Sequence, residues 1–241
     1  MKLRRHLVPL ALAGLALLPA AARAQGQFFF IHLPSSTATG TPSIDQITSA
    51  LGEIGADLQA NWQATHPGQT PKVCWAGYAG PWSPGGPNQY NFAGDAANRL
   101  GNASSTDNQE GYSVPIDYCA VDEILDELLA KCDIVIAMGE KPNSTSIDLE
   151  NHGSSTNPPP PDCAGNTPGG PVCSGDGCTG TDWSDPVECE TGGGCFIPSI
   201  AQWIVCGYEA RHAGDPTAIK VKISPSAGAF LCGYACCRAH Q

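Results

Sequence analysis

The hydrophobic positions of the chain fall into blocks that predict strands and helices in turn. Residues 27–33 are almost continuously apolar, which is typical of a strand buried on both faces. After a loop, residues 41–43 read Thr-Pro-Ser and begin a helix whose apolar side chains recur at helical spacing. These side chains are Ile44, Ile47, Leu51, Ile54 and Leu58. A strand, a loop and a helix in this order form the opening unit of an α/β fold.

The same alternation returns in the second half of the chain. Residues 120–131 predict an amphipathic helix, whose acidic side we expect to be solvated surface. Residues 132–139 predict a central parallel strand that ends in a glycine, residues 196–211 a helix, and residues 219–223 a strand. We therefore expect a single three-layer α/β domain, with a mainly parallel sheet and helices on both of its faces.

Two stretches lack this periodicity. Residues 77–111 are rich in Gly, Pro, Asn and Ser, and we interpret them as a long irregular loop, with a short strand at residues 72–76. Residues 153–195 contain five cysteines among Gly, Asp, Thr and Pro, which is typical of a loop insertion stapled by disulfides. The predicted domain therefore carries a large Cys/Gly/Pro-rich loop.

We expect no metal ion and no cofactor. The insertion contains no histidine, and its cysteines lack the paired Cys-x-x-Cys spacing of zinc sites. Asp176, Asp182 and Asp185 are candidate calcium ligands, but no glutamate closes an EF-type loop around them. The calcium signal is therefore weak.

Residues 1–24 have the pattern of a secretory signal peptide. Basic residues precede an apolar run at residues 7–18, and residues 22–24 read Ala-Arg-Ala, a small-residue cleavage site. The run is too short for a stable membrane span. The domain would then occupy residues 25–241 and be secreted or periplasmic, where disulfides are the default state of its 12 cysteines.

The net charge of the chain argues against some classes of binding partner. The full sequence has a net charge of −11. Removal of the leader's Lys2, Arg4, Arg5 and Arg23 leaves 8 basic against 23 acidic residues, a net charge of −15. So acidic a protein is a poor partner for nucleic acid or for an anionic membrane surface.

The strongest chemical candidate is Cys232. Residues 224–232 read Ser-Pro-Ser-Ala-Gly-Ala-Phe-Leu-Cys, a turn from a strand into a small-residue helix, with Cys232 at the opening of that helix. The helix dipole and unpaired backbone N–H groups there favour a thiolate, and Gly228 lets the backbone approach closely. The N–H groups of residues 229–232 are candidates to hold an oxyanion. The alternative is a buried or disulfide-bonded Cys232, which is the more common state in a cysteine-rich chain.

These motifs resemble the pyroglutamyl peptidase I (pyrrolidone-carboxylate peptidase) family of cysteine peptidases. Residues 224–232 are similar to the family's Ser-Asn-Thr-Ala-Gly-Thr-(Phe/Tyr)-Val-Cys, whose cysteine is the nucleophile. Residues 114–139 resemble its Leu-Pro-Val segment, helix and Pro-Asp-Val-Val-Leu-x-x-Gly strand, and residues 161–168 its Pro-(Asn/Asp)-Asn-x-Gly-x-x-Pro loop. The pattern Ile147-x-x-Glu150 lines up with Ile-x-x-Glu-Arg, whose glutamate belongs to the family's catalytic site.

The resemblance implies a cysteine peptidase that hydrolyses the amide bond after an N-terminal pyroglutamyl residue of a peptide or protein, without a cofactor. It makes Cys232 the nucleophile and gives Glu150 a place in the catalytic site. The family's catalytic histidine, which follows the cysteine's helix and one more strand, has no counterpart in this sequence. His152 is the best substitute base by its position near Glu150, whereas His32 and His212 would reach the site only through the tertiary structure.

Other departures from the family concern substrate recognition. Its Thr-Gly-Phe-x-Pro-Phe-Gly loop is replaced by residues 31–37, its Gly-Gln-Ala-Gly-Gly-Arg turn by residues 139–144, and the arginine after the glutamate by Asn151. The alternative function is therefore a catalytically inactive exported relative that serves as a disulfide-stapled binding or structural domain. The cysteine count favours this alternative, because a free Cys232 leaves 11 others, of which at least one more must be unpaired.

Overall fold

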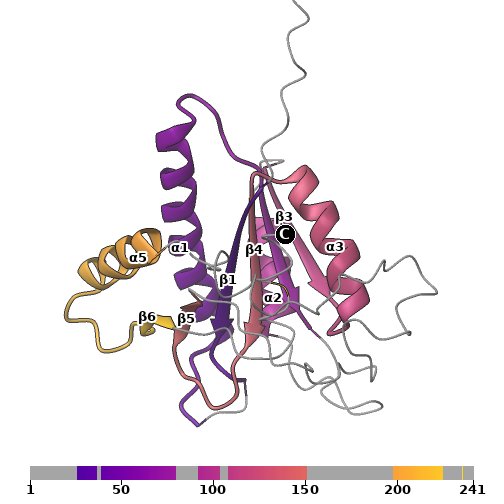
Figure 1. Ribbon diagram of the computed structural model, residues 1–241. Helices are drawn as coiled ribbons and strands as arrows, with labels where there is room; N and C mark the ends of the chain where they lie inside the picture. The colour runs from indigo at the N-terminus through magenta and orange to yellow at the C-terminus, as the bar shows by residue number, and fades with distance from the viewer. Residues whose placement is uncertain are drawn as a thin grey trace, which may run out of the picture.

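The centre of the molecule is a six-stranded sheet. The computed structural model describes residues 26–36, 39–79, 92–103, 108–150 and 198–224, together with Ala235. The strands are β1 (Gln27–Leu33), β2 (Val73–Tyr78), β3 (Gln109–Val114), β4 (Ile134–Glu140), β5 (Ile147–Glu150) and β6 (Val221–Ser224). Their order in the sheet is β3-β2-β4-β1-β5-β6 (Figure 1). Every neighbouring pair is parallel except β1 and β5, so the sheet is mainly parallel, as predicted.

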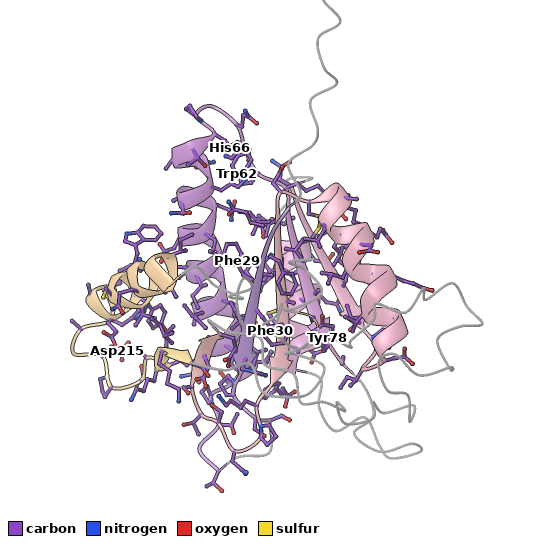
Figure 2. All side chains as sticks on the ribbon, viewed as in Figure 1. Phe29, Phe30, Trp62, His66, Tyr78 and Asp215 are labelled. Atoms are coloured by element: carbon purple, nitrogen blue, oxygen red, sulfur yellow. A yellow bond between two sulfur atoms is a disulfide. The ribbon has the colours of Figure 1, made fainter. Side chains whose placement is uncertain are left out.

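Helices cover both faces of this sheet. The helices are α1 (Ile44–Thr65), α2 (Phe92–Ala103), α3 (Tyr118–Lys131) and α5 (Pro198–Arg211). One hydrophobic core joins α1, α2 and α5 to one face, and a second core joins α3 to the other (Figure 1). Successive residues of β1 enter the two cores in alternation, with Phe29 in the first and Phe30 in the second (Figure 2). The predicted three-layer α/β domain is therefore confirmed.

The elements with clear hydrophobic periodicity lie where the sequence predicts them. The predicted first strand is β1, and the predicted helices of residues 120–131 and 196–211 are α3 and α5. The first helix, α1, begins after Ser43, whose hydroxyl accepts the Gln46 N–H at 3.3 Å while the Gln46 side chain accepts the Ser43 N–H at 2.9 Å. This reciprocal capping box satisfies two backbone donors that would otherwise be unpaired at the start of the helix.

The prediction of an irregular loop at residues 77–111 is wrong. This stretch contains the end of β2, all of α2 and the start of β3, while residues 80–91 and 104–107 lie outside the described residues. A Cβ atom on Gly77 would lie 2.0 Å from the carbonyl oxygen of Ala93, and one on Gly111 would lie 2.0 Å from that of Ala97. The glycines that suggest a loop instead allow the backbone of α2 to lie directly on β2 and β3.

A disulfide joins β2 to the connection between α3 and β4. Cys74 and Cys132 are 58 residues apart, and both are buried in the core beneath α3. Cys206 of α5 is an exposed free thiol. The predicted leader of residues 1–24 and the insertion of residues 153–195 lie outside the described residues.

The helices of the structure can be compared with the length and apolarity of a membrane span. Within the described ranges, no helix combines the length and the apolarity needed to cross a membrane. The 22-residue α1, the longest of the four helices named above, belongs to the core through one of its sides.

Candidate functional site

The candidate site is a buried polar cluster formed between β1 and β5. His32 of β1 and Asp148 of β5 are register partners across the antiparallel pair, and Glu150 ends β5. His32 Nδ1 lies 2.6 Å from Glu150 Oε1, and the two side chains are 7% and 0% exposed. An ionised Glu150 can only accept hydrogen bonds, and beside it the proton in this contact lies on His32 Nδ1. Glu150 therefore orients the His32 imidazole and selects its tautomer.

The cluster lies on the α3 face of the sheet. The ring of Phe30, which belongs to the α3 core, meets the His32 imidazole edge-on with a centroid distance of 5.1 Å. Phe30 also stacks on Tyr78 of β2, with centroids 5.8 Å apart (Figure 2). Side chains two residues apart on a strand share a face, so His32 points to the same side as Phe30. The imidazole is thus held by an aromatic ring on one side and by a carboxylate on the other.

Lys141 connects the two buried acids of β5. Its ammonium lies 2.9 Å from Asp148 Oδ2, 3.8 Å from Glu150 Oε1 and 3.4 Å from the Ser224 hydroxyl. Both acid side chains are 0% exposed, whereas that of Lys141 is 37% exposed. Asp148 and Glu150 are two residues apart and therefore share one face of the strand. One lysine that reaches in from the solvent thus contacts two fully buried carboxylates.

The two acids differ in how completely their oxygens are satisfied. Asp148 also accepts a hydrogen bond from the Ser146 hydroxyl at 2.6 Å, and Lys222 of β6 lies 3.5 Å from it. Glu150 Oε2, by contrast, is buried with no hydrogen-bond partner among the described residues. A buried oxygen without a hydrogen-bond partner costs about 1–3 kcal/mol of stability, which makes Glu150 the less satisfied of the two acids.

A third acid, Glu140, connects the chain segments beside this cluster. At the end of β4, its Oε2 accepts hydrogen bonds from the Ser36 N–H at 3.1 Å and the Ser36 hydroxyl at 2.9 Å. Its Oε1 accepts the N–H of Phe92, the first residue of α2, at 3.0 Å. A carboxylate at a helix N-terminus is stabilised by the helix dipole and by unpaired N–H groups. Glu140 therefore anchors both the chain after β1 and the start of α2.

The structure brings together some of the residues that the sequence singles out. Glu150 lies in the buried cluster, and His32, which the sequence mentions only as a residue that tertiary structure could bring in, is its partner. Cys232 and His152 lie outside the described residues. Lys141 is not among the predicted site residues, because acids at alternate positions of a strand ordinarily indicate a solvent-facing side, and only the tertiary structure shows that these two are buried.

His212 lies in a different place, between α1 and α5. Its Nε2 lies 2.9 Å from Glu53 of α1. The neighbouring Arg211 is bonded to Glu53 at 2.9 Å and to Asp57 at 2.8 Å. These ion pairs fasten the end of α5 to α1, which explains His212 without a chemical role.

The described residues contain no group of three or more His, Cys, Asp or Glu side chains placed to hold a metal ion. The weak calcium candidates Asp176, Asp182 and Asp185 lie outside these residues.

In comparisons with known proteins, no protein-family model, no curated protein and no solved structure matches this chain. The chemistry of the site is therefore inferred from its own residues.

Proposed function

We propose that this chain is a pyroglutamyl-peptidase-like cysteine peptidase, in which Cys232 is the nucleophile and His32, held by Glu150, is the base. The observation that carries the proposal is the 2.6 Å contact between His32 Nδ1 and Glu150 Oε1. In the triads of cysteine and serine hydrolases, the base is a histidine, and an acidic or amide side chain bonded to its Nδ1 orients it. His32 and Glu150 have this arrangement. His32 thereby takes the role for which the sequence favours His152.

The two described ends of the segment that contains Cys232 support this assignment. Ser224, the last residue of β6, is the register partner of Glu150. Ala235, three residues after Cys232, is buried in the α3 core, on the sheet face toward which His32 points. The described residues on either side of this segment therefore lie beside Glu150, in the case of Ser224, and on the sheet face that holds the base, in the case of Ala235.

The cysteine count is also compatible with a free Cys232. The Cys74–Cys132 disulfide and the free Cys206 thiol account for three of the 12 cysteines and leave nine. If Cys232 is free, the other eight can all be paired. The cysteine count therefore no longer argues against a free thiol at Cys232.

In the proposed reaction, His32 Nε2 accepts the proton of the Cys232 thiol, and the thiolate attacks the carbonyl carbon of the amide after the pyroglutamyl group. Backbone N–H groups near Cys232 stabilise the oxyanion. The imidazolium then gives its proton to the leaving amine as the C–N bond breaks, which leaves a thioester. Water, deprotonated by His32, cleaves the thioester and releases pyroglutamate and the thiol.

The test begins with protein purified from an oxidising compartment without reductant, whose free thiols are alkylated and mapped by mass spectrometry. We expect a labelled Cys232 and hydrolysis of a pyroglutamyl amide that Cys232→Ala abolishes. The His32→Gln variant should lose about 10²–10⁴-fold in kcat/KM, the usual contribution of a general base. Cys206→Ser, which removes the exposed thiol of α5, is the matched control and should react like the wild type. A Cys232 bridged to another cysteine, or hydrolysis that survives Cys232→Ala, would refute the proposal.

A second candidate function is an exported, catalytically inactive relative that acts as a disulfide-stapled binding or structural domain. The buried Cys74–Cys132 disulfide favours it, because two cysteines of this chain already form a structural bridge, the role that this alternative gives to Cys232. The thiol map separates the two candidates, because this alternative expects Cys232 to be bridged. Export itself is a proposal that rests on the pattern of residues 1–24 and on this disulfide.

A further inference from the structure

The two buried acids of β5, Asp148 and Glu150, differ in the number of lysines that contact them. Asp148 has two cationic partners, Lys141 at 2.9 Å and Lys222 at 3.5 Å. Glu150 contacts Lys141 at 3.8 Å and His32 at 2.6 Å, and the structure gives it no third partner among the described residues. Lys141 is therefore the permanent cation at Glu150, whereas the charge of His32 depends on its protonation.

This arrangement matters because Glu150 is fully buried. A carboxylate without solvent has to be neutralised by a neighbouring cation or else take up a proton. If Lys141 were absent, the remaining cation in contact with Glu150 would be the imidazolium form of His32. An imidazolium has no free nitrogen lone pair and cannot accept a proton from a thiol.

We propose that Lys141 is a positioning residue for the reaction: its ammonium neutralises Glu150, so that His32 stays uncharged beside a charged carboxylate and remains able to act as a base. This inference rests on the proposed function, which makes His32 the base. Asp148 and Ser224 hold the ammonium in place, at 2.9 and 3.4 Å from its nitrogen. The lysine thus acts on the chemistry through Glu150 and touches no reacting atom.

The charged groups that face Glu150 come from each neighbouring element. They are His32 from β1, Lys141 from the turn after β4, Asp148 from β5 itself and, through Asp148, Lys222 from β6. Lys222 contacts Asp148 and no oxygen of Glu150 within the described part of the chain. Lys222→Gln therefore removes one positive charge from the same cluster without removing the cation at Glu150, which makes it a matched control.

The experiment measures the protonation of His32 in the full chain by imidazole NMR with labelled histidine, over the acid to neutral range. The His32 signal is assigned with the His32→Gln variant. In the wild type, Lys141→Arg and Lys222→Gln, we expect a neutral imidazole at neutral pH that carries its proton on Nδ1. In Lys141→Gln, His32 should bind its second proton about tenfold or more tightly, and the acid limb of kcat/KM should move to higher pH by the same amount.

A His32 that titrates alike in the wild type and in Lys141→Gln would overturn the inference. If Lys141→Gln does not fold, which thermal unfolding reports, the wild type still decides: an imidazolium at neutral pH would contradict the proposal. The hydrolysis assay tests the proposed function separately. A wild type that leaves the amide intact yet shows the expected Lys141 dependence of His32 refutes the peptidase and supports the charge relationship.

Discussion

His32 and Glu150 are 118 residues apart in the chain, and their side chains meet at 2.6 Å. Their contact depends on the direction of β5, which runs antiparallel to β1. Because Leu149 pairs with Ile31, the last residue of β5 lies beside Phe30, inside the sheet. The reversal of this one strand therefore buries the carboxylate completely and sets it against the imidazole.

The first prediction concerns Glu150→Gln. The amide keeps the size of the side chain but cannot stabilise the imidazolium that forms during catalysis, so kcat/KM for the pyroglutamyl amide should fall about 10²–10⁴-fold. The measurement is steady-state hydrolysis as a function of pH. Glu209→Gln, an equivalent change at an exposed position of α5, should have no effect. Equal activity of the Glu150→Gln variant and the wild type would exclude Glu150 from the reaction.

The second prediction tests the close packing of α2. Gly77→Ala places a Cβ atom 2.0 Å from the carbonyl oxygen of Ala93, and because backbone has to move, the free energy of unfolding should fall by about 1–3 kcal/mol. Gly52→Ala, in the middle of α1, meets only Leu100 Cδ2 at 4.0 Å and should raise it by about 0.5–1 kcal/mol. Denaturant unfolding measures both. Two variants that change stability in the same direction would argue against this packing.

The third prediction concerns the buried disulfide. The chain-entropy model gives a bridge across 58 residues a stabilising effect of about 4 kcal/mol, because the bridge restricts the unfolded chain. The double variant Cys74→Ala/Cys132→Ala should therefore lose about 2–4 kcal/mol in denaturant unfolding without reductant. Cys206→Ala, at an exposed free thiol, should unfold like the wild type. If the double variant were as stable as the Cys206→Ala variant, the bridge would have no structural role.

The fourth prediction is a pH dependence of stability that arises at Glu110 of β3. A hydrogen bond from Lys72, at 2.5 Å, and a second from the Tyr112 hydroxyl lower the pKa of Glu110 from 4.5 to about 2. A lowered pKa means that the native state favours the charged form, so the contribution is complete above pH 4.5 and is lost as the pH falls toward 2. The side chain is 35% exposed, and solvent screening limits the effect to about 1 kcal/mol.

Unfolding free energies measured across this acid range in the wild type and in Glu110→Gln check the assignment. The variant should lose less stability than the wild type as the pH falls, whereas Glu209→Gln should follow the wild-type curve. Parallel curves for Glu110→Gln and the wild type would show that another group carries the acid sensitivity.

Much of the fold follows from local patterns in the sequence. The continuous apolar run of β1 and the helical spacing from Ile44 to Leu58 in α1 each indicate their element without reference to the rest of the chain. The same holds for α3. α2 is missed although Ala93, Ala96, Ala97 and Leu100 recur at helical spacing, because most of these side chains are small and the stretch around them is rich in Gly and Asn. The small side chains and the glycines opposite them matter only once the helix lies on the sheet.

The candidate site divides in the same way. The sequence by itself determined that the chain forms a mainly parallel α/β sheet, because hydrophobic periods are local properties. It also made Cys232 a candidate through the turn that contains it, and Glu150 a candidate through a family resemblance. Only the tertiary structure decided that β5 runs against β1, that His32 meets Glu150 and that Lys141 contacts two buried acids. These contacts join residues up to 118 positions apart, and strand order and direction, which local spacing does not encode, bring them together.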